Sequence, residues 1–95
     1  RILYVKCNSS LIKSNLDDQI EIIVEENLPY FNNNTTIRLD FSSNRILTLN
    51  SNLFRNEIFA NMDELLLNYN QICYLNPNLF NKNLINLKRV DLSYN

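Results

Sequence analysis

One arrangement of apolar and polar positions occurs three times along this chain. It is first seen in residues 36–54, which read TIRLDFSSNRILTLNSNLF, and it returns in residues 62–80 and, in part, in residues 87–95. Apolar residues stand at positions 1, 4, 6, 11 and 14 of the arrangement, with Asn at position 9 and Phe at position 19. A fixed period of this size is typical of proteins that stack one structural unit.

The three copies align on the asparagine at position 9. These asparagines are Asn44, Asn70 and Asn95, at steps of 26 (70 − 44) and 25 (95 − 70) residues. At the other positions the first copy has Thr36, which alone is not plainly apolar, and then Leu39, Phe41, Ile46, Leu49 and Phe54. The second copy has Met62, Leu65, Leu67, Ile72, Leu75 and Phe80, and the partial third has Leu87, Val90 and Leu92.

The pattern predicts a short strand followed by a turn and a returning segment. Positions 4 and 6 alternate, as in a short strand with one buried face. The asparagine at position 9 then lies where the chain leaves the strand, and its amide can bond backbone groups of neighbouring copies. Positions 11, 14 and 19 are expected to line the inside of the returning segment. Each copy needs its neighbours to cover its apolar face.

The residues before the first copy follow another pattern. Residues 1–7, RILYVKC, alternate as a strand, with Ile2, Tyr4 and Lys6 on one side and Leu3, Val5 and Cys7 on the other. Residues 8–18 are polar, with Leu11, Ile12 and Leu16 as expected inward anchors. Residues 19–24 read as a second short β-like segment, which Leu28-Pro29 closes, and residues 32–34 read as a loop. The many other asparagines are expected in turns, because the chain has no Gly.

The sequences MDELLLNYNQI and LKRVDLSYN resemble the signature of the leucine-rich repeat family, Leu-x-x-Leu-x-Leu-x-x-Asn-x-Leu. The resemblance covers residues 36–95 and implies repeats at 36–61, 62–86 and 87–95. It implies an α/β right-handed solenoid with a curved parallel sheet on its concave face and mostly loops on its convex face. Because the third copy stops at Asn95, we expect the chain to be a piece of a longer protein.

Residues 1–35 resemble the N-terminal cap of extracellular leucine-rich repeat proteins, in which a strand ending in Cys precedes a Leu-Pro and an Asn-Thr-Thr run. This resemblance implies that Cys7 forms a disulfide with a cysteine outside the chain. Cys73 follows the inward Ile72, so we expect an outward, free thiol. Two strand spacings of about 4.8 Å exceed the roughly 7 Å Cα limit for a disulfide, so Cys7 and Cys73 are not expected to bond. Glycosylation sequons begin at Asn8, Asn33 and Asn34.

Composition narrows the chemistry of the chain. The net charge is −1, with acids and bases interspersed, so we expect no nucleic-acid partner. Without His or Gly the chain lacks the usual groups for Ser-His catalysis, zinc binding or phosphate loops. We therefore expect no enzyme, cofactor, metal or small-molecule substrate. The carboxylate pairs at 17–18, 25–26 and 63–64 read as solvated surface. Residues 20–24 are too short to span a bilayer, so membrane attachment is expected only through parts outside the chain.

Candidate binding residues stand at positions 2, 3, 5, 7 and 8, which are expected to point out from the concave face. Across the copies they give the rows Arg38–Glu64–Arg89 and Asp63–Lys88, and they place Tyr69 beside Tyr94. Ile37, Ser42, Ser43 and Ser93 belong to the same positions. The residues that we expect to contact a ligand are Arg38, Asp40, Glu64, Leu66, Asn68, Tyr69, Arg89, Asp91 and Tyr94.

The resemblance implies a protein-binding module. We expect a piece of an extracellular or cell-surface receptor, adhesion or matrix protein that recognises a protein ligand through its concave face. Exposed neighbouring tyrosines favour this interpretation, because such rings often anchor protein partners. Two alternatives remain open: an intracellular scaffold or regulatory subunit, and the targeting arm of a larger enzyme.

Overall fold

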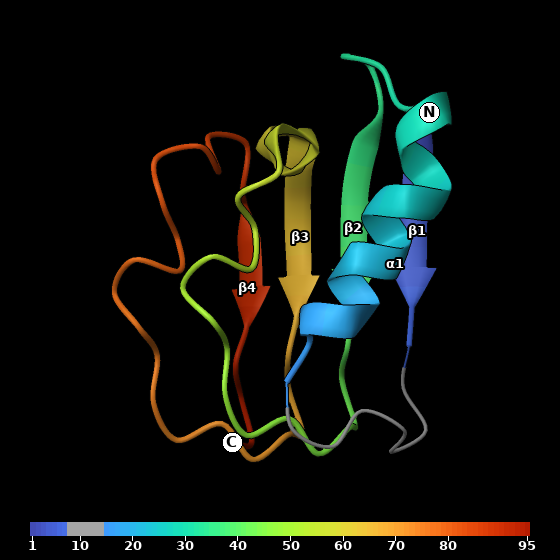
Figure 1. Ribbon diagram of the computed structural model, residues 1–95. Coiled ribbons are helices and arrows are strands. Elements are labelled where there is room, and N and C mark those ends of the chain that lie inside the picture. Colours follow the sequence, from blue (N-terminus) through green and yellow to red (C-terminus); the bar gives the residue numbers. More distant parts are fainter. Residues whose placement is uncertain (8–14) are drawn as a thin grey trace.

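The computed structural model describes residues 1–7 and 15–95. Four strands form one parallel sheet in the order β1-β2-β3-β4, which is also their order along the chain (Figure 1). The strands are β1 (Ile2–Lys6), β2 (Thr36–Asp40), β3 (Met62–Leu66) and β4 (Arg89–Asp91). The helix α1 (Asp17–Asn27) and the 3-10 helix η1 (Leu28–Tyr30) lie between β1 and β2, and the 3-10 helix η2 (Glu57–Asn61) directly precedes β3.

The register of the sheet places equivalent positions of the copies side by side. Val5, Leu39, Leu65 and Val90 form one continuous row across the four strands. Between β2 and β3 the register shifts at Ile37 and Arg38, so that Ile37 faces Met62. Backbone bonds continue past the assigned strands, because the Ser43 and Tyr69 N–H groups donate to the carbonyls of Asn68 and Ser93, at 3.0 and 3.1 Å.

The core lies between one face of the sheet and the segments that connect the strands. Its fully buried members include Ile37, Leu39 and Phe41, which alternate along one chain segment. Phe54 and Phe59 meet edge to face with ring centroids 5.3 Å apart, and both are fully buried. Burial of each such ring stabilises the fold by about 1.5–3 kcal/mol. The segments that carry these rings are thereby held against the sheet.

Helix α1 occupies the place of a predicted β-like segment, so the prediction for residues 19–24 is wrong. Leu16, Ile20 and Ile23 are spaced by 4 and 3 residues and are all buried. That spacing gives one apolar face to a helix. Asp17 and Asp18 lie in the first turn, where negative charge favours the positive end of the helix dipole. Helix α1 ends before Pro29 and packs its apolar face on the core (Figure 1).

Two predicted orientations in the repeats are also wrong. Ile37, expected on the outward face, is fully buried, while Thr36 is only half-buried, because the register shift gives the first inward position to Ile37. Phe80, expected inside, is exposed, and the preceding Leu79 is fully buried instead. The expected anchors Leu11 and Ile12 lie outside the described residues.

Asparagine builds the turns of the connecting segments. The Oδ1 atoms of Asn50 and Asn76 accept from the backbone N–H two residues later, both at 2.9 Å. Asn32, Asn56 and Asn81 form the same local bond. Such turns need no Gly. In the described part of the chain, no helix is long and apolar enough to cross a bilayer.

Candidate binding surface

The asparagines at position 9 hold the ends of neighbouring strands together. The Nδ2 group of Asn70 donates to the carbonyls of Phe41 and Leu67, both at 3.0 Å, and its Oδ1 accepts from the Ile46 N–H at 3.1 Å. Asn44 and Asn95 donate in the same way, to Cys7 at 2.6 Å and to Leu67 at 2.9 Å across the sheet. These side chains satisfy backbone groups that face the core. These bonds therefore hold the end of each strand in place, together with the backbone of the residue that precedes the asparagine.

That preceding residue, at position 8, has a left-handed backbone in all three copies. Ser43, Tyr69 and Tyr94 have φ angles of 59°, 59° and 58°. A left-handed conformation costs an L-residue other than Gly roughly 1–2 kcal/mol. The turn into the asparagine ladder imposes this geometry, since it recurs with unrelated side chains.

Tyr69 and Tyr94 stack on one another at the carboxyl ends of β3 and β4. Their ring centroids are 4.5 Å apart and the ring planes differ by 4°. The two residues are 53% and 72% exposed, so the pair presents a large apolar surface to solvent. No core position demands these rings.

The open sheet face is the face whose side chains point away from the core; it carries Tyr4, Arg38, Asp40, Glu64, Leu66, Arg89 and Asp91. Its ion pairs differ in part from the predicted rows. The Arg38 guanidinium binds the Asp63 carboxylate through two bonds, of 3.0 and 3.3 Å, which raises the pKa of Arg38. The register confirms that Arg38 and Glu64 are neighbours in the position-3 row, although the ion pair that Arg38 forms is with Asp63. Asp63 and Lys88 are neighbours as predicted, because the Lys88 N–H donates to the Asp63 carbonyl at 2.9 Å; among the described residues their side chains form no ion pair.

Arg89 contacts two carboxylates. Its Nη1 lies 3.4 Å from Glu64 Oε2, on the neighbouring strand, and its Nη2 lies 3.8 Å from Asp91 Oδ2. The Arg89 side chain is 61% exposed, so these pairs add little stability. They place the Arg89 guanidinium close to both carboxylates.

Leu66 lies between two aspartates at position 5. The register pairs it with Asp40 on one side and Asp91 on the other. Each aspartate accepts from a serine two residues later, with Oγ to Oδ1 distances of 2.6 Å at both Ser42 and Ser93. The half-buried Leu66 is therefore an apolar position flanked by two oriented carboxylates.

Asp40 is only 6% exposed, so the expectation of a directly accessible binding residue is wrong. Tyr4 Oη donates to Asp40 Oδ2 at 3.2 Å and covers it. Burial raises the pKa of Asp40, but the hydrogen bonds from Ser42 and Tyr4 outweigh it and lower the pKa overall. The serine bonds likewise lower the pKa of Asp91. Both groups carry their negative charge over the physiological range.

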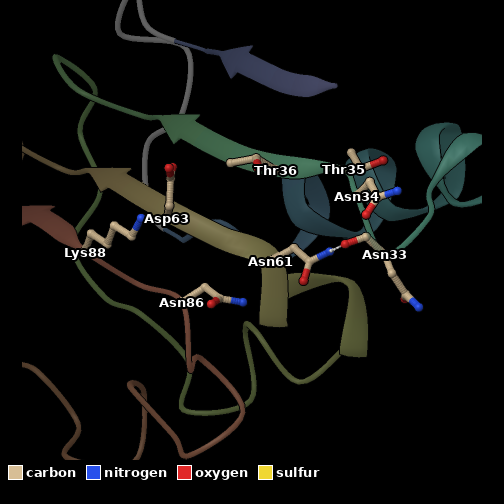
Figure 2. A pocket seen from close by; sticks show the side chains of 8 residues that line it. All are labelled: Asn33, Asn34, Thr35, Thr36, Asn61, Asp63, Asn86 and Lys88. Carbon is tan, nitrogen blue, oxygen red and sulfur yellow. Dashed lines mark hydrogen bonds between the residues drawn. The ribbon is translucent and has the colours of Figure 1, made fainter.

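A polar groove of about 300 Å³ lies at the other end of the strands, where β2, β3 and β4 begin. Figure 2 shows its side chains, which are Asn33, Asn34, Thr35, Thr36, Asn61, Asp63, Asn86 and Lys88. The Nδ2 of Asn61 donates to the Asn33 carbonyl at 3.1 Å, and that of Asn86 donates to the Ala60 carbonyl at 2.7 Å. These bonds fix both amides at the groove.

Sequence reasoning missed this second set of asparagines and the cover that Tyr4 gives to Asp40. Asn61 and Asn86 are 25 (86 − 61) residues apart, so the repeat period could have revealed them. They directly precede position 1, outside the repeat signature. Tyr4 belongs to β1, and its contact with Asp40 depends on the β1–β2 register. That register is not readable from the repeats.

Both cysteines and two of the three sequon asparagines lie in the described part of the chain. Both cysteines are free; Cys7 is half-buried and Cys73 is exposed. Burial raises the pKa of the Cys7 thiol. Asn33 and Asn34 are exposed at the groove, whereas Asn8 lies outside the described residues. Within residues 1–7 and 15–95, no group of three or more His, Cys, Asp or Glu is placed to hold a metal ion.

The candidate surface thus combines a tyrosine stack at one end of the strands, charged side chains and Leu66 in the middle, and a polar groove at the other end. Such an arrangement offers contact area and hydrogen bonds. Comparisons of the chain with protein-family models, with curated proteins and with solved structures found no match.

Proposed function

We propose that this chain is a leucine-rich repeat module that binds a protein ligand through its open sheet face. The observation that carries the proposal is the pair of stacked, exposed tyrosines, Tyr69 and Tyr94, held on left-handed backbone. The repeat pattern, the parallel sheet in chain order and the asparagines that bond neighbouring strands support the family and the solenoid fold.

The choice of tyrosine at position 8 is hard to explain by folding alone. The left-handed backbone there is imposed by the turn, and Asn or Gly would adopt it at lower cost than Tyr. This chain uses Asn in many other turns. Residues kept in sparsely populated backbone regions gather at functional sites. Two successive tyrosines at the same strained position therefore favour a role in recognition.

The stacked pair has the properties of an interface anchor. Each ring is a rigid apolar surface with a polar hydroxyl, and aromatic residues dominate the binding energy of many interfaces. Stacking fixes both rings before a ligand arrives, so little side-chain freedom is lost on binding. At 53% and 72% exposure, both rings retain substantial area for a partner to cover.

The rest of the open sheet face supplies a polar rim. Arg38 is held by Asp63, and Arg89 is held by Glu64, so these charges can orient a partner without large rearrangement. Leu66 adds a second, smaller apolar contact between the two aspartates. An apolar anchor with polar surroundings is the usual anatomy of a protein interface.

In this proposal the chain is a piece of an extracellular or cell-surface receptor, adhesion or matrix protein. The exposed sequons at Asn33 and Asn34 are accessible for glycosylation, and the half-buried Cys7 would join a cysteine outside the chain. Intact mass of the protein from its natural source, with and without reductant and after enzymatic deglycosylation, tests the compartment. A reduced Cys7 and unmodified asparagines would favour an intracellular scaffold.

A comparison of two double variants tests the binding role. The first, Tyr69→Ser with Tyr94→Ser, removes the stack; the second, Tyr30→Ser with Tyr74→Ser, removes two equally exposed rings elsewhere, at 66% and 68% exposure. Wild type and both variants are immobilised, and captured proteins are quantified by mass spectrometry. A true ligand is retained by wild type and by the second variant.

The first variant should lose that ligand. If each ring acts as an anchor worth about 2 kcal/mol, the affinity should fall about thirtyfold for each ring. Circular dichroism on both variants checks that they remain folded. A ligand that the first variant binds as well as wild type does would refute the proposed site.

A further inference from the structure

A second polar cavity lies between the segment connecting β2 to β3 and the segment connecting β3 to β4. Its volume is about 340 Å³. One wall carries Ser51, Asn52 and Arg55, and the other carries Asn78, Lys82 and Asn83. These connections also carry core residues such as Leu53 and Leu79, so the cavity is separate from the open sheet face and from the tyrosine stack.

The walls of this cavity are built from turns that repeat with the copies. Asn50 Oδ1 accepts from the Asn52 N–H, and Asn76 Oδ1 accepts from the Asn78 N–H, both at 2.9 Å. The steps 76 − 50 and 78 − 52 are both 26 residues. Directly after these turns, Leu53 and Leu79 are buried and anchor the backbone. The cavity therefore has two equivalent, fixed edges.

A third turn completes the wall. The Asn83 N–H donates to Asn81 Oδ1 at 2.8 Å, and the next residue, Leu84, is buried. The side-chain amides of Asn52, Asn78 and Asn83 make no hydrogen bond within the described part of the chain. Each can donate two N–H groups to a ligand.

The charge in the cavity has one sign. Arg55 and Lys82 are its only charged lining residues, and neither forms an ion pair with any residue in the described ranges. The acidic Asp17 and Glu21 of α1 line a neighbouring cavity, which shares only Asn52 with this one. Glu57 follows Arg55 by two residues and does not line the cavity. A ligand therefore meets two cations and no lining carboxylate.

We propose that this cavity binds the phosphate or sulfate group of a ligand. A tetrahedral oxyanion can accept from the Arg55 guanidinium fork, the Lys82 ammonium and the side-chain amides of the two walls. Arginine suits this role because its N–H groups match two oxygens of one phosphate or sulfate. The cavity volume exceeds that of one such group, so it also admits the group to which the oxyanion is esterified.

Titration with inorganic phosphate and sulfate tests the proposal directly. Backbone and side-chain amide resonances of Asn52, Asn78 and Asn83 are followed by NMR, with sodium chloride at matched ionic strength as reference. We expect saturable shifts confined to these residues and their neighbours, with half-saturation in the millimolar range. Shifts that chloride reproduces would mean screening of surface charge only, and would overturn the proposal.

Variants assign the effect to the two cations. Arg55→Gln and Lys82→Gln should each weaken phosphate binding roughly tenfold, since a charge-assisted bond is lost in each. Arg45→Gln removes an exposed cation outside the cavity and should leave phosphate binding unchanged. Equal weakening by all three variants would overturn the assignment.

The source of the oxyanion is distinguished by three further probes. O-phosphoserine, glucosamine 6-sulfate and inositol phosphate present the group on a peptide-like, a saccharide and a lipid-headgroup carrier, and the tightest binder names the class. The Tyr69→Ser/Tyr94→Ser variant should bind phosphate as wild type does. The two proposals can therefore fail independently. Absence of saturable binding to every oxyanion probe would leave the cavity without a ligand and refute its assignment.

Discussion

Replacement of Asn70 by Ala removes the centre of the asparagine ladder. The side chain is 8% exposed and makes four hydrogen bonds, to the carbonyls of Phe41, Leu67 and Asn68 and from the N–H of Ile46. The bonds to Phe41 and Ile46 cross to the preceding copy, so the substitution weakens the joint between two copies and not only one turn.

The cost of Asn70→Ala depends on which hydrogen bonds the partners of Asn70 keep after the substitution. The Phe41 carbonyl keeps a bond from Asn44, at 2.9 Å, and the Leu67 carbonyl keeps a bond from Asn95, also at 2.9 Å. The Ile46 N–H has no such substitute, and Ile46 is fully buried. An orphaned buried donor costs about 1–3 kcal/mol, and each lost net bond costs about 0.5–1.5 kcal/mol. We therefore expect Asn70→Ala to lower the free energy of unfolding by about 3 kcal/mol.

Urea unfolding followed by circular dichroism measures this loss. The total stability is expected to be about 5–15 kcal/mol. In a thermal melt, a loss of about 3 kcal/mol would lower Tm by roughly 12–24 °C. Asn95→Ala is the matched control, since Asn95 makes the same kind of bond to the Ile72 N–H at 3.0 Å but is exposed. There water can replace the amide, and the loss should be smaller, about 1 kcal/mol. Equal losses in the two variants would refute the reasoning from burial.

Three further outcomes are expected. Tyr69→Gly should change the free energy of unfolding by less than about 1 kcal/mol, because relief of the left-handed backbone offsets loss of the stack. Tyr69→Val, in contrast, should lower the free energy of unfolding by about 1–2 kcal/mol. Equal urea midpoints for the two variants would contradict this expectation. The lowered pKa of Asp40 implies a stabilising contribution that is present above the unfolded pKa of about 3.9 and is lost as the pH falls through the folded pKa. Asp40→Asn should therefore flatten the acid limb of a curve of stability against pH. An unchanged acid limb would show that other groups dominate the loss of stability in acid. Arg38→Gln breaks a partly exposed pair and should cost less than about 1 kcal/mol, less still in 1 M NaCl; a larger, salt-independent cost would contradict a surface pair.

The inward positions were readable from the sequence because they repeat. Leu39, Leu65 and Val90 fall at position 4 of the copies, and the sheet register brings them together. A residue type that recurs at one offset reports a contact made between copies, so its environment can be inferred without coordinates. The position-9 asparagines belong to the same class, and their bonds run between adjacent copies.

Features that occur once were not readable in this way. Residues 20–24 read IEIIV, which favours a strand by residue type, whereas α1 is selected by the spacing of Leu16, Ile20 and Ile23 against the core. Tertiary packing overrode local preference there. Because Leu16 lies outside the β-like segment, the helical face was split between two predicted elements.

Departures from strict repetition explain the wrong predictions within the repeats. Ile37, Leu39 and Phe41 alternate regularly, whereas in the second copy the inward Met62 stands three positions before Leu65 (65 − 62). The sheet absorbs this difference in the register shift at Ile37, and alignment of the copies alone hides it. The shift also brings the Arg38 side chain to Asp63. Alignment of the copies shows which residues are neighbours across the strands, but it does not show which of these neighbours form ion pairs.

The positions that carry function should be those where the fold fixes the backbone and leaves the side chain free. Position 8 meets this condition: the φ angle is the same in all three copies, yet the residue changes from Ser43 to Tyr69 and Tyr94. Position 5 behaves similarly, with Leu66 between two aspartates. The change from serine to stacked tyrosines alters the exposed surface, since both rings are exposed. A ligand that covers both rings would explain the change and would also justify the backbone strain that each tyrosine bears.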